Sequence, residues 1–475
     1  MPIIGPKGNL LQLLGDPIGQ MGQRFQKYGK IAALVKGHKV GVFATDPDCP
    51  GTLFVYGPEL NEQVLNQADI YHRVPLSGPL YPRGNITLRQ RPLLNYATGL
   101  FAVNDDDHRR HRRLLAPAFH KKGIEAYYAD MVALTLEMLG SWQLNEIRNI
   151  HQDMIGLTLR IVIKALFGEG LISESLRVTD ALQESFRLAL SPLTVGLPLD
   201  LPGLPYRRLL DVVAQYINGL ENIIAQKRSQ GAGSTDLLSM LLRAQDEDGS
   251  TLTETEVIGH VGLILGAGHE TSAGTLTWTL FLLSQHPRFN NDLLRELTDE
   301  LQGQPPTLEQ LNKLPLLEYA IKESMRVLPV APWNDRIIAQ ATHLGGYDLP
   351  VGTEILVSNY HTQHMPDIYR EPEVFNPYRW ADIKPSLFEY SPFGGGPRMC
   401  IGAPFAMMEM RIVLAILLQR YRLQFTSDTF IDRKVGITMF PKNGLRMFVR
   451  KQDAQFEQGV GGVRGNVREM VELPT

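Results

Sequence analysis

Residues 393–402 constrain this chain most, because they place one cysteine between a glycine-rich loop and an apolar helix. Three consecutive glycines at 394–396 permit backbone conformations closed to other residues and let the loop approach a flat ligand closely. Arg398 adds a fixed cation two positions before Cys400. Pro404 and the apolar periodicity after it predict a helix, so Cys400 should lie near a helix N-terminus, where the dipole favours a thiolate. The loop therefore suits a planar, anionic partner.

A thiolate in this position could be a nucleophile, a metal ligand or an inert buried side chain, and the last is the usual state of a lone intracellular cysteine. The pattern Phe-x-x-Gly-x-Arg-x-Cys-x-Gly argues against the inert state. It resembles the haem-binding loop of the cytochrome P450 family. The resemblance implies that Cys400 is the axial thiolate of a haem b iron and that Arg398 pairs with a haem propionate. The other cofactor contacts that it implies in this loop are Phe393, Gly394 and Gly402.

Composition excludes several other classes of protein. The 47 basic and 50 acidic residues nearly cancel, so no global field favours nucleic acid or an anionic membrane. Cys49 and Cys400 are the only cysteines, which excludes a disulfide framework and a multi-cysteine metal site and fits a reducing compartment. The N-terminus lacks a signal pattern, and no stretch approaches the roughly 18 apolar residues of a membrane helix. We therefore expect a cytoplasmic protein with neither a membrane anchor nor a nucleic-acid partner.

A run of six basic or titratable residues at 108–113 follows an acidic helix start. It has no wider basic stripe and no interleaved aromatics, so a solvated helix face is a better interpretation than a nucleic-acid patch. His108 and Arg112 share one face and resemble the family's Trp-x-x-x-Arg helix, whose arginine binds a haem propionate; His108 stands in the place of the tryptophan. The remaining arginines are candidates for docking an acidic electron donor, with simple solvation as the alternative. They are Arg109, Arg110 and Arg113.

A capping box at Thr253 and Glu256 opens a long apolar helix that contains two glycines, an acid and a hydroxyl at 266–271. Glycine inside a helix costs about 0.5–1 kcal/mol relative to alanine, so close approach of a ligand is the simplest explanation for the pair. The stretch resembles the oxygen-activating helix of the family, which implies that Glu270 and Thr271 deliver protons to dioxygen. A dinucleotide fingerprint is excluded, because Thr271 stands where its third glycine belongs.

Three further charged residues follow in the order typical of the family. Glu323 and Arg326 are neighbours on one predicted helix, and Arg379 comes later in a segment resembling the one that completes a Glu-Arg-Arg network. One carboxylate shared by two guanidiniums would hold the cysteine loop, and exposed salt bridges are the alternative. Arg336 begins a predicted strand and resembles another propionate partner.

The resemblance extends over about residues 1–450. It implies one mainly α domain, the cytochrome P450 fold, a triangular prism of helices with a smaller β-rich lobe. Residues 451–475 are polar and contain four glycines, which predicts a flexible C-terminal tail. Family topology predicts an apolar substrate pocket beneath a loop at 74–100 and a proline-broken lid. Its predicted lining residues are Ile264, Ala267, Val330, Trp333, Thr438 and Met439.

The implied function is that of a haem-thiolate monooxygenase. Two electrons and O2 would insert one oxygen atom into an apolar substrate, by hydroxylation or epoxidation. The chain contains no reductase segment, so we expect a monomer that takes electrons from a separate ferredoxin or flavodoxin with its reductase. A haem-thiolate isomerase or peroxygenase and a non-catalytic haem sensor are the alternatives, and both have less need of Glu270 and Thr271.

Overall fold

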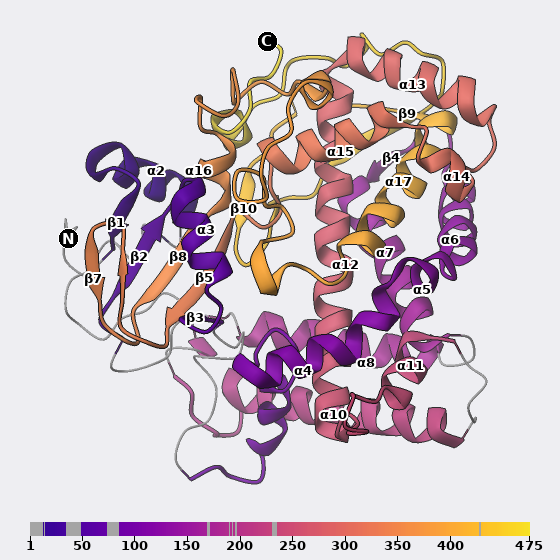
Figure 1. Cartoon of the computed structure of the whole chain (residues 1–475). Coiled ribbons are helices and arrows are strands. Elements are labelled where there is room, and N and C mark those ends of the chain that lie inside the picture. Colours follow the sequence, from indigo (N-terminus) through magenta and orange to yellow (C-terminus); the bar gives the residue numbers. More distant parts are fainter. Residues whose placement is uncertain are drawn as a thin grey trace.

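Helix α12 (Glu254–Gln285) is the central element of the computed structural model. Its start follows from the sequence, because the side chains of Thr253 and Glu256 each accept the other's backbone N–H, as the predicted capping box requires. Beyond residue 271 nearly every side chain is buried, since other elements surround the helix. Figure 1 shows α12 running through the helical part, with α17 (Ala403–Arg420) beside it and α8 (Ile172–Ala189) and α10 (Pro205–Ser229) across its lower end.

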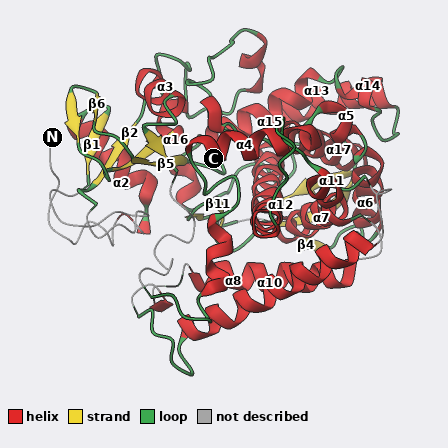
Figure 2. Cartoon of the chain, turned by 60° about the horizontal axis from the view of Figure 1, so that its bottom comes forward, coloured by secondary structure: helices red, strands yellow, loops and turns green. Residues whose placement is uncertain are grey.

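The remaining helices pack around this axis, and Figure 2 shows them filling most of the molecule. The structure describes residues 13, 15–34, 49–73, 85–168, 172–189, 191, 193–194, 197–229, 235–426 and 429–475. None of the helices in these ranges is long and apolar enough to cross a membrane. The other α-helices are α2 (Pro17–Tyr28), α3 (Pro58–Asn66), α4 (Asp105–Leu115), α5 (Lys121–Glu125), α6 (Tyr128–Gly140), α7 (Ile150–Phe167), α11 (Leu237–Arg243), α13 (Pro287–Leu301), α14 (Leu308–Leu311), α15 (Pro315–Val327) and α16 (Asn359–Gln363). The 3-10 helices are η2 (Arg91–Ala97), η3 (Ala116–Phe119), η4 (Pro377–Ala381), η5 (Gly396–Arg398) and η6 (Asn466–Glu469).

Most strands gather in a smaller lobe at one side of the helices (Figures 1 and 2). Among the described residues its main sheet has the order β1-β2-β8-β5-β3, in which only β2 and β8 are parallel. Its strands are β1 (Ile31–Ala33), β2 (Thr52–Val55), β3 (Tyr71–His72), β5 (Trp333–Ile338) and β8 (Glu354–Ser358). The smaller sheets are formed by β4 (Ile147–Asn149), β12 (Arg446–Lys451) and β9 (Tyr421–Gln424); β10 (Arg433–Val435) and β11 (Met439–Pro441); and β6 (Thr342–Leu344) and β7 (Tyr347–Leu349). The predicted helical body with a smaller β-rich lobe is therefore observed.

The C-terminal segment differs from its prediction as a flexible tail. Residues 451–475 pack into the molecule, where Val467 and Met470 are buried and the Gln285 amide donates to the Gly459 carbonyl at 3.1 Å. The glycines explain the wrong expectation, because they adopt positive φ where backbones meet. A Cβ atom on Gly465 would lie 2.2 Å from the Ile431 carbonyl oxygen. These glycines form tight turns, which composition alone does not distinguish from disorder.

Two predicted segments and one connection between strands lie partly outside the described residues. Strands β1 and β2 pair antiparallel, and positions 35–48 between them are not described. The loop expected to roof the pocket is described from residue 85 onward. The lid is described except for positions 190, 192 and 195–196.

Candidate active site

The cysteine loop is held in a tight conformation between α3 and the start of α17. Gly394 and Gly396 have φ of 73° and 64°, and a Cβ atom on Gly396 would lie 2.2 Å from the carbonyl oxygen of Leu65 in α3. The Cys400 N–H donates to the Phe393 carbonyl at 2.9 Å, which closes the loop. Gly402 then caps α17. The sequence therefore folds as predicted here, with the cysteine at a helix N-terminus.

Cys400 is a free cysteine whose residue is exposed to solvent. Burial raises the pKa of its thiol, and the backbone N–H groups of Gly402 and Ala403 and the Arg112 guanidinium oppose that shift. A thiol of this kind becomes a thiolate when a cation binds it, which is the behaviour of a metal ligand.

Three guanidiniums lie near this loop with one carboxylate among them; those of Arg73 and Arg336 are buried and that of Arg398 is half-buried. Burial, then Arg73 and Arg398, lower the pKa of Arg336 to about 9, and Asp335 opposes them. Burial and Arg73 likewise lower the pKa of Arg398 to about 10. The counter-ion Asp335 lies 2.9 Å from Arg73, and the Arg398 Nε has no partner among the described residues. Such an excess of buried positive charge fits a ligand with two carboxylates. Together with the accessible thiol, these residues fit a haem.

Arg73 is a member of this cluster that the sequence did not reveal. It follows β3, stacks at 3.6 Å on the Phe101 ring, and exchanges backbone hydrogen bonds with the Asn104 side chain. The same Asn104 side chain and the Val103 carbonyl accept from Arg398. A single arginine after a short strand carries no motif, so only the tertiary contacts identify it.

Helix α4 brings its two predicted residues to the same place. His108 is buried, and burial, Arg398 and Arg112 lower its pKa to about 4, so it is a neutral imidazole able to donate one hydrogen bond. Arg112 donates to the Met399 carbonyl at 2.8 Å. It therefore ties α4 to the cysteine loop directly, which the family pattern did not predict.

The arginines of α4 that were candidates for docking an electron donor are paired with acidic residues of the chain. Arg109 contacts Asp106 at 2.6 Å and Asp69 at 2.8 Å, and Arg113 contacts Asp246 at 2.8 Å. Arg110 lies 3.0 Å from Glu256 of α12. Each guanidinium is thus neutralised within the chain, and local pairing weakens the long-range attraction for an acidic partner.

The glycines of α12 make room for neighbouring helices. A Cβ atom on Gly266 would lie 3.0 Å from the Phe186 ring of α8, and one on Gly268 would lie 2.9 Å from Val162 of α7. Helix packing therefore explains both glycines, and the predicted approach of a ligand is not needed. On this stretch Ala267 is exposed and Thr271 half-buried, whereas the residues after Thr271 are buried, so α12 also borders an open space at this point. The Thr271 hydroxyl donates to the Ala267 carbonyl at 2.9 Å.

The predicted Glu-Arg-Arg residues meet in the protein interior. Arg326 donates to both oxygens of Glu323 at 2.8 and 3.0 Å, and Arg379 Nε donates to Oε1 at 3.0 Å. The Asn376 N–H and the Trp380 indole N–H also donate to Glu323, at 3.0 and 2.9 Å. All three charged side chains are buried. The alternative of exposed salt bridges is therefore wrong.

The predicted pocket residues divide into two groups. Ile264 and Trp333 are half-buried and Ala267 is exposed. Val330 and Thr438 are buried, and Met439 has no exposed surface. The Met439 backbone donates to the Val330 carbonyl at 2.8 Å and accepts from the Trp278 indole at 3.1 Å. Met439 thus belongs to the core, because an apolar side chain on a short strand can face either way.

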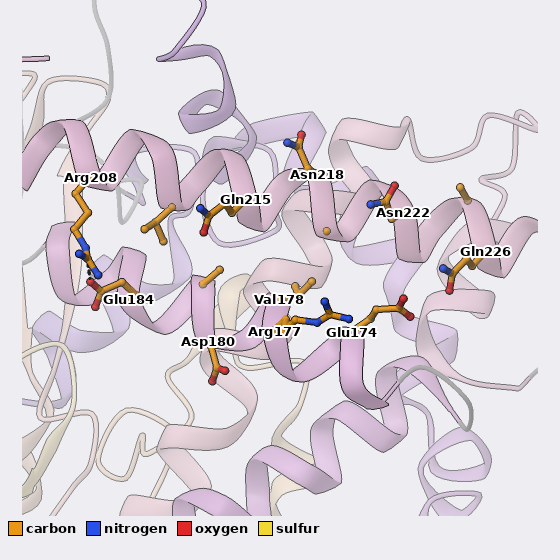
Figure 3. Close-up of a pocket in the computed structure, with 14 residues that line it drawn as sticks. Glu174, Arg177, Val178, Asp180, Glu184, Arg208, Gln215, Asn218, Asn222 and Gln226 are labelled. Atoms are coloured by element: carbon orange, nitrogen blue, oxygen red, sulfur yellow. Dashed lines mark hydrogen bonds and ion pairs between the residues drawn. The ribbon is translucent and has the colours of Figure 1, made fainter. Parts of the chain in front are cut away.

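A groove of about 900 Å³ lies elsewhere, between α8 and α10. Figure 3 shows a row of amides from α10 along one side, namely Gln215, Asn218, Asn222 and Gln226, facing charged residues of α8. None of its lining residues belongs to the cysteine loop or to α12. It is a surface feature separate from the site.

Glu409 is a buried acid that the sequence analysis missed. It has no exposed surface, and both carboxylate oxygens lack a hydrogen-bond partner among the described residues. Burial raises its pKa to about 8, and the neighbouring Ser272 hydroxyl of α12 opposes this shift only in part. The sequence feature that could have identified Glu409 is a charged residue at a core position of an apolar helix. Glu409 is therefore protonated at neutral pH, at the contact between α17 and α12.

This protonation predicts a pH dependence of stability. Between the unfolded pKa of about 4.5 and the folded pKa of about 8 the folded state binds the extra proton. Stability should therefore fall as pH rises through this window, by about 1 kcal/mol per pH unit. Glu409→Gln removes the titrating carboxyl group, so the melting temperature should change less between pH 5.5 and 8 than in the wild type. The same substitution at the exposed Glu457 should leave the pH dependence unchanged. Parallel profiles for wild type and Glu409→Gln would contradict this.

Comparison with known proteins agrees with the geometry. Residues 4–447 match the family model described as Cytochrome P450. The chain is 33% identical over 376 residues to cyclooctat-9-en-7-ol 5-monooxygenase of Streptomyces melanosporofaciens, covering 77% of this chain and 79% of the relative. It is 30% identical over 401 residues to pentalenene oxygenase of Streptomyces avermitilis, covering 82% and 86%. The fold superposes on a retinoic acid-bound cyanobacterial P450 with a TM-score of 0.79 and 23% identity, covering 95% of this chain and 100% of that one. The chain belongs to the cytochrome P450 family and is an oxidoreductase of the monooxygenase class.

Proposed function

We propose that this monooxygenase binds haem through Cys400 and hydroxylates or epoxidises an apolar, unsaturated substrate. The observation that carries the proposal is an accessible, desolvated thiol at a helix N-terminus, beside an excess of buried guanidiniums. The names of two relatives specify an alkene, pentalenene, and an unsaturated alcohol, cyclooctat-9-en-7-ol. Wall residues such as Ile264 and Trp333 suit molecules of that class.

Different residues of the site would bind different parts of the cofactor. When bound, a haem supplies the redox-active iron that oxygen activation requires. Cys400 would ligate that iron as a thiolate, with its charge stabilised by the N–H groups of Gly402 and Ala403. The groups proposed to bind the propionates are Arg73, His108, Arg336 and Arg398. Arg112 holds the loop that carries the thiolate.

Glu270 and Thr271 are proposed to move protons. Insertion of one oxygen atom consumes O2, two electrons and two protons, and releases one water. The Thr271 hydroxyl donates to the Ala267 carbonyl, so its oxygen can still accept a hydrogen bond, and rotation away from that carbonyl would let it pass its own proton onward. Glu270 precedes Thr271 and is half-buried, and its proposed role is to transfer protons from solvent to the Thr271 hydroxyl. The electrons are proposed to come from a ferredoxin or flavodoxin with its reductase.

Thr271→Ala tests both the reaction class and the relay. With an alkene or alcohol that shifts the ferric spectrum, this variant should still consume reductant and O2 but release the oxygen as hydrogen peroxide. Product per reductant should fall about tenfold or more, since positioned proton transfer is worth roughly 10²–10⁴ in rate. Thr271→Ser keeps the hydroxyl and should stay near wild type. If the hydroxyl serves only the helix backbone, stability changes and product per reductant does not. Absence of O2-dependent product from the wild-type protein with every such compound would contradict the proposed reaction.

A further inference from the structure

The described end of the loop expected to roof the pocket makes an exceptionally close contact with α12. A Cβ atom on Gly99 would lie 2.6 Å from the Gly259 carbonyl oxygen. In the other direction, a Cβ atom on Gly259 would lie 2.3 Å from the Thr98 hydroxyl. That hydroxyl lies 2.9 Å from the Thr255 carbonyl, one turn earlier. The two backbones therefore touch, and only glycine at both positions permits it.

His260 connects this contact to a hydrogen bond. Its side chain has no exposed surface, and its Nδ1 accepts the Leu100 N–H at 3.3 Å. Burial, His111 and Arg110 lower the pKa of His260 to about 3, although Glu256 opposes them, so the ring is neutral. Because Nδ1 accepts, the proton is on Nε2.

Helix α4 joins the same cluster through His111. Its Nε2 lies 2.9 Å from Glu256 Oε1, which also accepts from Arg110 at 3.0 Å. Burial alone would raise the pKa of Glu256, but the Thr253 N–H, His111 and Arg110 outweigh it and lower the pKa to about 2. Glu256 is thus a carboxylate and His111 donates to it.

The imidazoles of His111 and His260 pack edge to face. Their ring centroids are 4.9 Å apart at an interplanar angle of 74°. His111 Nδ1 and His260 Nε2 have no partner among the described residues. This ring contact joins α4 to α12 beside the loop end.

We propose that His260 is a positioning residue that fixes both the end of the roof loop and α4 to α12, and thereby sets how slowly a bound apolar ligand leaves the pocket. His108, which is proposed to bind a propionate, and Arg112, which holds the cysteine loop, lie three residues before and one residue after His111 on α4. The effect on the ligand rests on the proposed function, because it assumes that the loop roofs the pocket. The clamp, by which we mean the attachment of the loop end and of α4 to α12 through His260, does not rest on the proposed function.

The test compares His260→Leu with His260→Asn in the haem-loaded protein. Asn Oδ1 can replace Nδ1 as the acceptor for the Leu100 N–H, whereas Leu cannot. Amide exchange at residues 98–100 and dissociation of 1-dodecylimidazole, followed by the ferric spectrum, should each accelerate about fivefold in His260→Leu, as expected for one lost hydrogen bond of about 1 kcal/mol. His260→Asn should remain close to wild type in both measurements.

Unchanged exchange in His260→Leu, or equal acceleration in both variants, would overturn the proposal. If His260→Leu does not fold, Gly259→Ala provides a second test of the contact between the loop end and α12. Its methyl group would push away Thr98 and Gly99 while leaving His260 in place, so exchange at 98–100 should again accelerate. Unchanged exchange there would contradict the clamp. Exchange reports on the loop whether or not the protein turns over, so failure of the clamp and failure of the proposed function are distinguishable.

Discussion

Cys400→Ser should abolish the spectral signature of thiolate ligation in the reduced carbonyl complex and, with it, monooxygenase activity. A serine oxygen is a much weaker electron donor to iron than a thiolate, and its proton is far harder to remove. The N–H groups of Gly402 and Ala403, which oppose the raised pKa of the Cys400 thiol, would then face a neutral hydroxyl. Haem retention should fall as well, because the guanidiniums that remain bind only the periphery of the cofactor.

Cys49→Ser is the matched control. Unlike Cys400, Cys49 is buried, and its sulfur lies 3.5 Å from the carbonyl of Gly51, which precedes β2 in the β-rich lobe. Its replacement should leave both haem content and the carbonyl spectrum unchanged. Survival of the thiolate signature in Cys400→Ser, or its loss in Cys49→Ser, would show that the ligand has been assigned wrongly. The measurement needs only reduced protein and carbon monoxide, so it does not depend on knowing the substrate.

Local spacing explains which parts of this site were predictable. Cys400 and Arg398 are two residues apart, and Glu323 and Arg326 are three apart on one helix, so their proximity follows from backbone geometry. Arg379 was predicted only through its order in the family pattern, and the structure brings it within 3.0 Å of Glu323. The mainly helical fold with a smaller β-rich lobe followed from the same resemblance.

The residues that sequence reasoning missed depend on contacts between distant segments. Arg73 joins Arg336 and Arg398 from three separate parts of the chain, and Glu409 meets Ser272 across two helices. Neither pairing has a spacing that a sequence pattern could reveal. Glycines were misjudged for a related reason: both those in α12 and those after residue 458 serve close contacts with elements that the sequence does not identify.

Glu323→Ala should produce the largest loss of stability among these variants. Glu323 accepts five hydrogen bonds from Arg326, Arg379, Trp380 and the Asn376 backbone, and its side chain has no exposed surface. Its removal leaves two buried guanidiniums without their shared carboxylate, which costs about 3–5 kcal/mol of unfolding free energy. We expect little haem-loaded protein, with near-normal turnover for each haem that is retained, because the network lies outside the proposed proton relay.

Glu318→Ala provides a control on the same helix. Glu318 pairs with Lys322 at 2.6 Å, but both side chains are about one third exposed, and an ion pair of this kind contributes only about 0–1 kcal/mol. Urea unfolding and haem content measured on both variants separate a buried network from an ordinary surface pair. If Glu323→Ala unfolded at the same urea concentration as Glu318→Ala and retained as much haem, the buried carboxylate would have no special part in holding the cysteine loop. If instead it kept its stability but lost turnover per haem, Glu323 would act on the chemistry, and the assignment of this network to folding would be wrong.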